Sequence, residues 1–89
     1  MQGRILVFAV PGSPATTTSG INPAGAIAGS YADASFTFQG FLRAKDGTIT
    51  TIDPSGSKGT TVNGINPDGR ITGSYSDANS VAHGFVWSK

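Results

Sequence analysis

The stretch GINPAGAIAGSY, from Gly20 to Tyr31, recurs as GINPDGRITGSY, from Gly64 to Tyr75. The two stretches lie 44 positions apart, and the same offset aligns residues 3–45 with residues 47–89 without a gap, with 20 of these 43 pairs identical. A period of about 40 to 50 residues is typical of repeat architectures, among them the β-propellers. We therefore interpret residues 1–89 as one repeat domain made of two units, 3–45 and 47–89.

Each unit has the pattern of strands joined by tight turns. Gly or Pro interrupts the chain at short intervals and no stretch has helical periodicity, so the sequence predicts an all-β fold. Three strands are expected in each unit, over 16–22, 26–33 and 38–45 and over 60–66, 70–77 and 81–89. A fourth strand, 48–53, follows the hairpin signal Asp46-Gly47. At the offset of 44 its counterpart is 4–10, at the start of the chain.

This strand order predicts two permuted propeller blades. A four-stranded unit of about 44 residues has the size of one blade. The first blade would span 16–53, and the second would combine 60–89 with strand 4–10 of a neighbouring chain. Because a propeller needs about four to eight blades, we expect a homo-oligomer closed by a heterologous contact, a trimer first and a tetramer second. The alternative fold is a monomeric eight-stranded sandwich or barrel.

Composition excludes several classes of partner. The formal charge is +1 and 12% of residues are charged, so the chain has no basic face for nucleic acid. No apolar run reaches the roughly 18 residues of a membrane-spanning helix, and membrane insertion is not expected. The start, Met1-Gln2-Gly3-Arg4, lacks the apolar segment of a signal peptide. This favours a cytosolic protein or one whose leader is not part of this chain.

One segment of the second unit carries a family resemblance. The sequence His83-Gly84-Phe85-Val86-Trp87, preceded by GINPDG at 64–69 and GSY at 73–75, resembles the HAF-repeat proteins of bacteria, over essentially all 89 residues. Two departures are Gly84, where the family has Ala, and Gln39 of the first unit, where the family has His. The resemblance implies a propeller-like protein of the extracellular space or cell envelope, and it implies no chemistry.

Positions that differ between the units point to candidate binding residues. Trp87 stands where the first unit has Arg43, Phe36 where the second has Ser80, Phe38 where it has Ala82, and Arg70 where the first has Ala26. Core packing should be alike in both units, so a large aromatic present in one unit is a candidate for a ligand contact. Trp87 is the best candidate for stacking on a sugar, with coverage of the subunit seam as the alternative. The full set of candidate ligand contacts is Tyr31, Asp33, Phe36, Arg43, Tyr75, Asp77, His83 and Trp87.

Several of these candidates also have a structural interpretation. Asp33 and Asp77 suit the capping of a turn, and Tyr31 and Tyr75 suit packing between blades. His83 is the only histidine and the chain has no cysteine, so zinc is not expected. A lone histidine at the start of a strand, as His83 is, suits a hydrogen bond to the backbone.

The sequence predicts a protein without enzymatic activity, metal or cofactor. It has no nucleophile motif and no phosphate-binding loop. We expect a lectin-like binding module for carbohydrate, whose ligand-binding rim is formed by the turns after the second and fourth strands, at 11–15, 33–38, 55–59 and 77–82. The alternative is a structural repeat with no ligand of its own.

Overall fold

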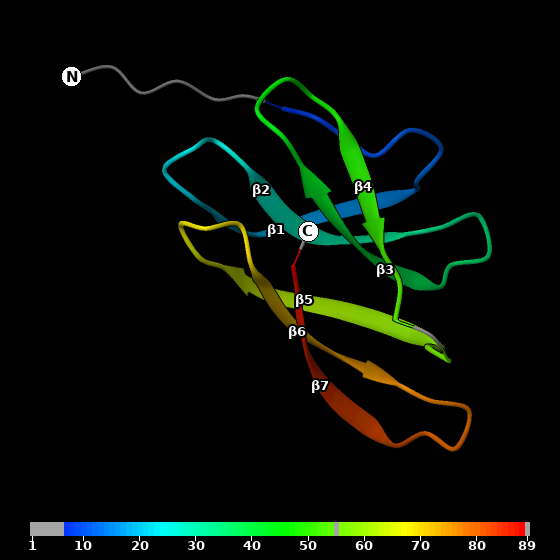
Figure 1. The fold of residues 1–89 in the computed structure, drawn as a ribbon. Helices are drawn as coiled ribbons and strands as arrows, with labels where there is room; N and C mark the ends of the chain where they lie inside the picture. The colour runs from blue at the N-terminus through cyan, green and yellow to red at the C-terminus, as the bar shows by residue number, and fades with distance from the viewer. Residues whose placement is uncertain (1–6, 55, 89) are drawn as a thin grey trace.

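The chain folds into two antiparallel sheets. The computed structural model describes residues 7–54 and 56–88, and these contain seven strands and no helix (Figure 1). It follows that no helix in this part of the chain could cross a membrane. The four-stranded sheet has the order β1-β2-β3-β4 and the three-stranded sheet the order β5-β6-β7. The strands are β1 (Ala15–Ile21), β2 (Ile27–Ala32), β3 (Phe38–Arg43), β4 (Ile49–Ile52), β5 (Gly59–Ile65), β6 (Ile71–Ser76) and β7 (Ala82–Trp87).

The predicted strands are confirmed to within two residues at each end, apart from the one at the N-terminus. Of the predicted strand 4–10, residues 4–6 lie outside the described residues, and residues 7–10 belong to no strand. The predicted pairing of this strand with another chain stays a prediction. The first three strands of the two sheets repeat each other. Even the register shift recurs at the same place, between Thr18 and Gly20 in β1 and between Val62 and Gly64 in β5.

The repeated turn Asn-Pro-x-Gly explains why both units start with the same hairpin. In the first unit the Gly25 amide donates to the Asn22 carbonyl oxygen at 3.0 Å, and Gly25 has a φ of +85°. The Asn22 side chain accepts a hydrogen bond from the Ala26 amide at 3.0 Å. Asn66 makes the same two bonds in the second unit, to Gly69 and Arg70. The backbone geometry of the turn is thus met by Asn and Gly at fixed positions.

Each sheet has two faces, which we name by their central residues. Side chains alternate between faces along a strand, and the strand registers place Phe41 opposite Gly29 and Phe85 opposite Gly73. The front face of a sheet is the one that carries Phe41 or Phe85. The back face carries the neighbouring glycine of the same strand, Gly40 or Gly84.

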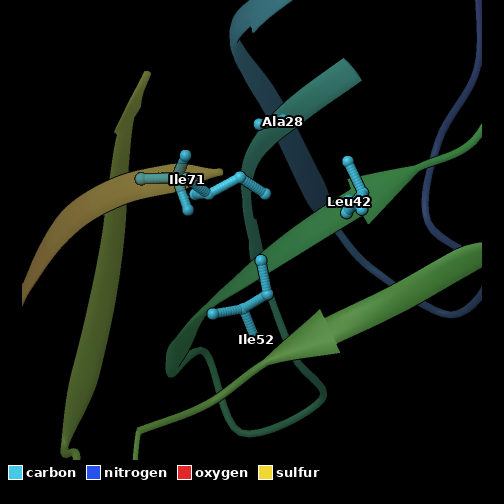
Figure 2. Close-up of a cluster of buried hydrophobic side chains, with 5 residues drawn as sticks. Ala28, Leu42, Ile52 and Ile71 are labelled. Carbon is cyan, nitrogen blue, oxygen red and sulfur yellow. The ribbon is translucent and has the colours of Figure 1, made fainter. Parts of the chain in front are cut away.

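The core lies where the back face of the four-stranded sheet meets the front face of the three-stranded sheet. Ala28, Leu42 and Ile52 pack there with Val62 and Ile71, and Figure 2 shows Ile71 pointing toward the other three labelled side chains. All five are at most 6% exposed, and burial of apolar surface is the main stabilising term in such an interface. The strand of the second sheet that lies against β1, β2 and β3 is β5.

Gly40 allows β5 to approach the first sheet. A Cβ atom at Gly40 would lie 2.9 Å from the Cγ2 atom of Val62, which is closer than carbon atoms pack. The absence of a side chain at Gly40 therefore leaves the space that Val62 fills.

Three hydrogen bonds also join the two sheets. The Val62 amide donates to the Ser30 hydroxyl at 3.0 Å, and the Ser19 hydroxyl donates to the Val62 carbonyl oxygen at 2.6 Å. The Asn22 side-chain amide donates to the Asn66 carbonyl oxygen at 3.2 Å. These bonds fix the register of β5 on the first sheet, because each uses one particular backbone group.

Candidate functional site

Two sheet faces have no covering sheet among the described residues. The front face of the four-stranded sheet is the counterpart of a face that is buried in the second sheet. Val62 is 2% exposed, whereas its counterpart Thr18 is exposed. Ile21, near the end of β1, is 67% exposed.

The back face of the three-stranded sheet is uncovered in the same way. Leu42 is 6% exposed, whereas its counterpart Val86 is 68% exposed. A Cβ atom at Gly84 would have no neighbour closer than the carbonyl oxygen of Gly73, at 4.0 Å. The two uncovered faces are therefore of the same two kinds as the faces that meet inside the chain, one front and one back.

The groups that form hydrogen bonds between the sheets are also present on the uncovered back face. Ser74 and Asn66 are the counterparts of Ser30 and Asn22, and Asn63 is the counterpart of Ser19. Within the described part of the chain, the hydrogen bonds that correspond to those between the sheets are not formed by these three side chains. The back face of the second sheet thus retains donors and acceptors for a surface like β5.

A groove lies between the two sheets, at the end where the turns after β1 and β5 meet. Its volume is about 470 Å³. Asp68 and Arg70 line the groove, and neither forms an ion pair with another described residue. The remaining lining residues are Asn22, Ala24, Ala26, Leu42, Ala44, Pro67, Gly69 and Ser88. This groove can offer a guanidinium, a carboxylate and backbone groups to a ligand.

The predicted binding rim lies at the opposite end of the strands, and Asp33 and Asp77 cap its turns. The Oδ1 atom of Asp33 accepts hydrogen bonds from the amides of Ser35 and Thr37, at 2.8 and 3.0 Å. Asp77 accepts the same two bonds, at the same distances, from Asn79 and Val81. Both aspartates therefore have a structural role in the turn between the second and third strand of their sheet.

A side chain from the third strand contacts each of these aspartates. The Oδ2 atom of Asp77 lies 2.8 Å from Nε2 of His83, and the Oδ2 atom of Asp33 accepts a hydrogen bond from the Gln39 amide at 3.3 Å. The pKa of Asp77 is lowered by the His83 hydrogen bond and then by the Val81 amide. The pKa of Asp33 is lowered mainly by the Thr37 amide. Both carboxylates are thus stabilised in their charged form.

The structure brings Tyr75, Asp77 and His83 together. The rings of Tyr75 and His83 are stacked, with centroids 5.0 Å apart and an interplanar angle of 26°. In the first sheet Tyr31 lies beside Phe41 as Tyr75 lies beside Phe85, with ring centroids 6.4 Å apart in both pairs, and the Tyr31 hydroxyl is 3.1 Å from that of Thr51. The histidine of the second unit and the glutamine of the first therefore occupy equivalent places beside an aspartate.

Of three further predicted residues, Trp87 and Arg43 lie apart from these clusters, and Phe36 lies in the Asp33 turn, where its amide donates to the Asp33 carbonyl oxygen at 2.8 Å. Trp87 packs against the core between the sheets, and the guanidinium of Arg43 lies 5.0 Å from the ring centroid of Phe8. Both are at the end of the strand away from the Asp33 and Asp77 turns. Phe36 is in the predicted rim, with 75% of its surface exposed and a φ of +59°.

Sequence reasoning did not identify the groove or the position of Phe8. Arg70 differs from its counterpart Ala26, but the sequence predicts that the turns after the first strand lie away from the ligand. The Phe8 ring packs on Phe41, with centroids 6.0 Å apart at 80°. The offset of 44 makes Phe8 the counterpart of Ile52, and this relation was the available signal.

No metal centre is formed by the side chains in the described part of the chain, since no three His, Asp or Glu residues lie close enough to share an ion. Comparison with known proteins finds no matching family model, no similar curated protein and no similar solved structure. The resemblance to the HAF-repeat proteins therefore stays a prediction from the sequence.

Proposed function

We propose that this chain is a non-enzymatic repeat subunit that assembles with copies of itself into a β-propeller ring. In this assembly the uncovered back face of the three-stranded sheet of one copy packs on the uncovered front face of the four-stranded sheet of the next. The contact is heterologous and closes a ring when the rotations add to a full turn. Three copies would give six blades and four copies eight.

The observation that carries this proposal is the match between the interface inside the chain and the two uncovered faces. Both front faces have a phenylalanine at their centre, Phe41 or Phe85. Both back faces have a glycine, Gly40 or Gly84. Val86 replaces Leu42 with another apolar side chain. Ile21 on the uncovered front face and Val86 on the uncovered back face are exposed apolar side chains that a partner would cover.

Retained polar groups also support self-assembly. The Ser74 hydroxyl would accept a hydrogen bond from the backbone amide of Thr18 in the next copy, as the Ser30 hydroxyl accepts one from the Val62 amide. Asn66 would donate to the Asn22 carbonyl oxygen of the next copy, as Asn22 donates to Asn66 within the chain. The same chemistry would then join sheets within and between chains.

Substitution of Gly84 tests the proposal. Gly84→Val has room in a single chain, but in the assembly its side chain would meet Thr18 of the next copy. We expect this variant to fold and to lose assembly, seen as a fall in mass by sedimentation. The matched variant Gly40→Val would meet Val62 within the chain and should lower the free energy of unfolding by about 1–3 kcal/mol. An assembly of unchanged mass with Gly84→Val would contradict the proposed contact.

A second candidate function is the binding of carbohydrate in the grooves between sheets. Asp68 and Arg70 have no ionic partner among the described residues, and a ring would repeat the groove, so that weak sites would act together. The test is a glycan array probed with the wild type and with Arg70→Ala. Binding that Arg70→Ala abolishes would support the groove, and an array without a ligand would favour a scaffold that binds only itself. The resemblance to extracellular proteins agrees with either role.

A further inference from the structure

The three-stranded sheet lacks a counterpart of β4. Among the described residues β7 pairs only with β6, whereas β3 pairs with both β2 and β4. The outer edge of β7 therefore presents backbone N–H and C=O groups that a further strand could bind. The six residues of β7 have the same length as β3.

The segment before β1 turns into the first sheet as β4 turns into the second. The Ser13 amide donates to the Val10 carbonyl oxygen at 3.0 Å, and the Ser57 amide donates to the Pro54 carbonyl oxygen at 3.0 Å. Gly12 and Gly56 follow the same backbone path, with φ of +81° and +83°. Val10 therefore enters its turn as Pro54 does after β4.

The side-chain contacts of this segment also resemble those of β4. Ile52 of β4 belongs to the core against which Phe85 packs, and its counterpart Phe8 packs on Phe41. Phe8 thus occupies, on the front face of the four-stranded sheet, the place that Ile52 occupies on the front face of the three-stranded sheet. Ile52 belongs to β4, whereas among the described residues Phe8 belongs to no strand.

We propose that Val7 and Phe8 of one copy pair with β7 of the preceding copy and complete its sheet as a fourth strand. The β3–β4 register pairs Gly40 with Ile52 and Phe41 with Thr51. Moved by 44 positions, it pairs Gly84 with Phe8 and Phe85 with Val7 of the next copy. The contact is a strand addition, in which backbone hydrogen bonds give the affinity and Phe8 gives the register. It rests on the proposed function, since it needs the same order of copies.

A pairing within one chain does not fit the structure. Phe8 lies on the front face of the four-stranded sheet, and the three-stranded sheet packs on its back face. The segment and β7 are therefore on opposite sides of the first sheet. The donated strand must come from a second copy.

Cysteine cross-linking of the full-length chain tests the strand donation. Ala9 and His83 are one step beyond the pair Phe8–Gly84 in the proposed register, and both are exposed. The chain has no cysteine of its own. We expect the double variant Ala9→Cys/His83→Cys to form, on oxidation, a ladder of covalent species at multiples of the 9.0 kDa chain mass. Each single variant alone should remain at the mass of one chain under denaturing conditions.

The matched control is Gln39→Cys/Asp53→Cys. These two residues are the counterparts of His83 and Ala9 at the pair β3–β4 within one chain. This variant should form a disulfide within one chain and give no ladder. An oligomer in solution whose Ala9→Cys/His83→Cys variant gives no ladder would overturn the strand donation and leave the proposed assembly in place. A wild type that is monomeric would overturn both.

Discussion

At the scale of single residues, Phe36 is the least expected feature of the structure. It has a φ of +59° and an exposed ring, although a side chain with a Cβ atom disfavours the left-handed region. Its counterpart Ser80 has a φ of +62°, so the turn requires this conformation in both units. The sequence shows that Phe36 replaces Ser80, but it does not predict the positive φ of Phe36. The pattern Asp-Ala-Ser-Phe has no glycine or asparagine at its fourth position to indicate that conformation.

The strain predicts that Phe36→Asn stabilises the fold. Asparagine adopts positive φ more easily than phenylalanine, and the exposed ring has little packing to lose. We expect the free energy of unfolding to rise by about 1 kcal/mol, measured by urea denaturation. The control Ser35→Asn, at a position that Asn79 occupies in the second unit, should change it by less than about 0.5 kcal/mol. A loss of stability with Phe36→Asn would show that the ring makes a contact that holds the turn.

At the scale of elements, the strands could be predicted from the sequence. Which face of each sheet packs against the other sheet could not. Asn22, Gly25 and the pair Asp46-Gly47 mark turns by local chemistry, so the strand boundaries follow from the sequence. Which face of a sheet is covered depends on contacts between residues distant along the chain. Val62 and Thr18 stand at the same position of β5 and β1, yet only Val62 is buried.

The candidate site could likewise be predicted only where it depends on the order of the strands. The turns at Asp33 and Asp77 were placed at one rim, and that placement follows from strand order alone. The groove at Arg70 depends on how closely two sheets approach at their other end. No single stretch of sequence contains that information.

The burial of β5 predicts the effect of Val62→Thr. This substitution makes β5 resemble β1 and places a hydroxyl in the core without an assigned partner, which costs about 1–3 kcal/mol. We expect a corresponding fall in the free energy of unfolding. The reverse change at the neighbouring exposed residue, Thr61→Val, should alter it by less than about 0.5 kcal/mol. Equal effects of the two substitutions would contradict the packing of β5 on the first sheet.

At the scale of the whole molecule, the two sheets meet through a contact that the two end faces could repeat with other copies. The back face of the four-stranded sheet is covered by the three-stranded sheet, and the same two kinds of face are uncovered at the ends. A chain of this size buries only about 60 to 65% of its unfolded surface, so burial of both end faces in an assembly would stabilise it further. A monomeric sandwich would leave Ile21 and Val86 exposed and Phe8 without a sheet to join.

The most direct test is the absolute mass of the wild-type protein in solution, measured by light scattering after gel filtration. We expect a single stable species at three or four times the 9.0 kDa mass of one chain, and the value would also give the number of blades. A species at 9.0 kDa over the whole range of concentrations would contradict the ring and favour a monomeric sandwich.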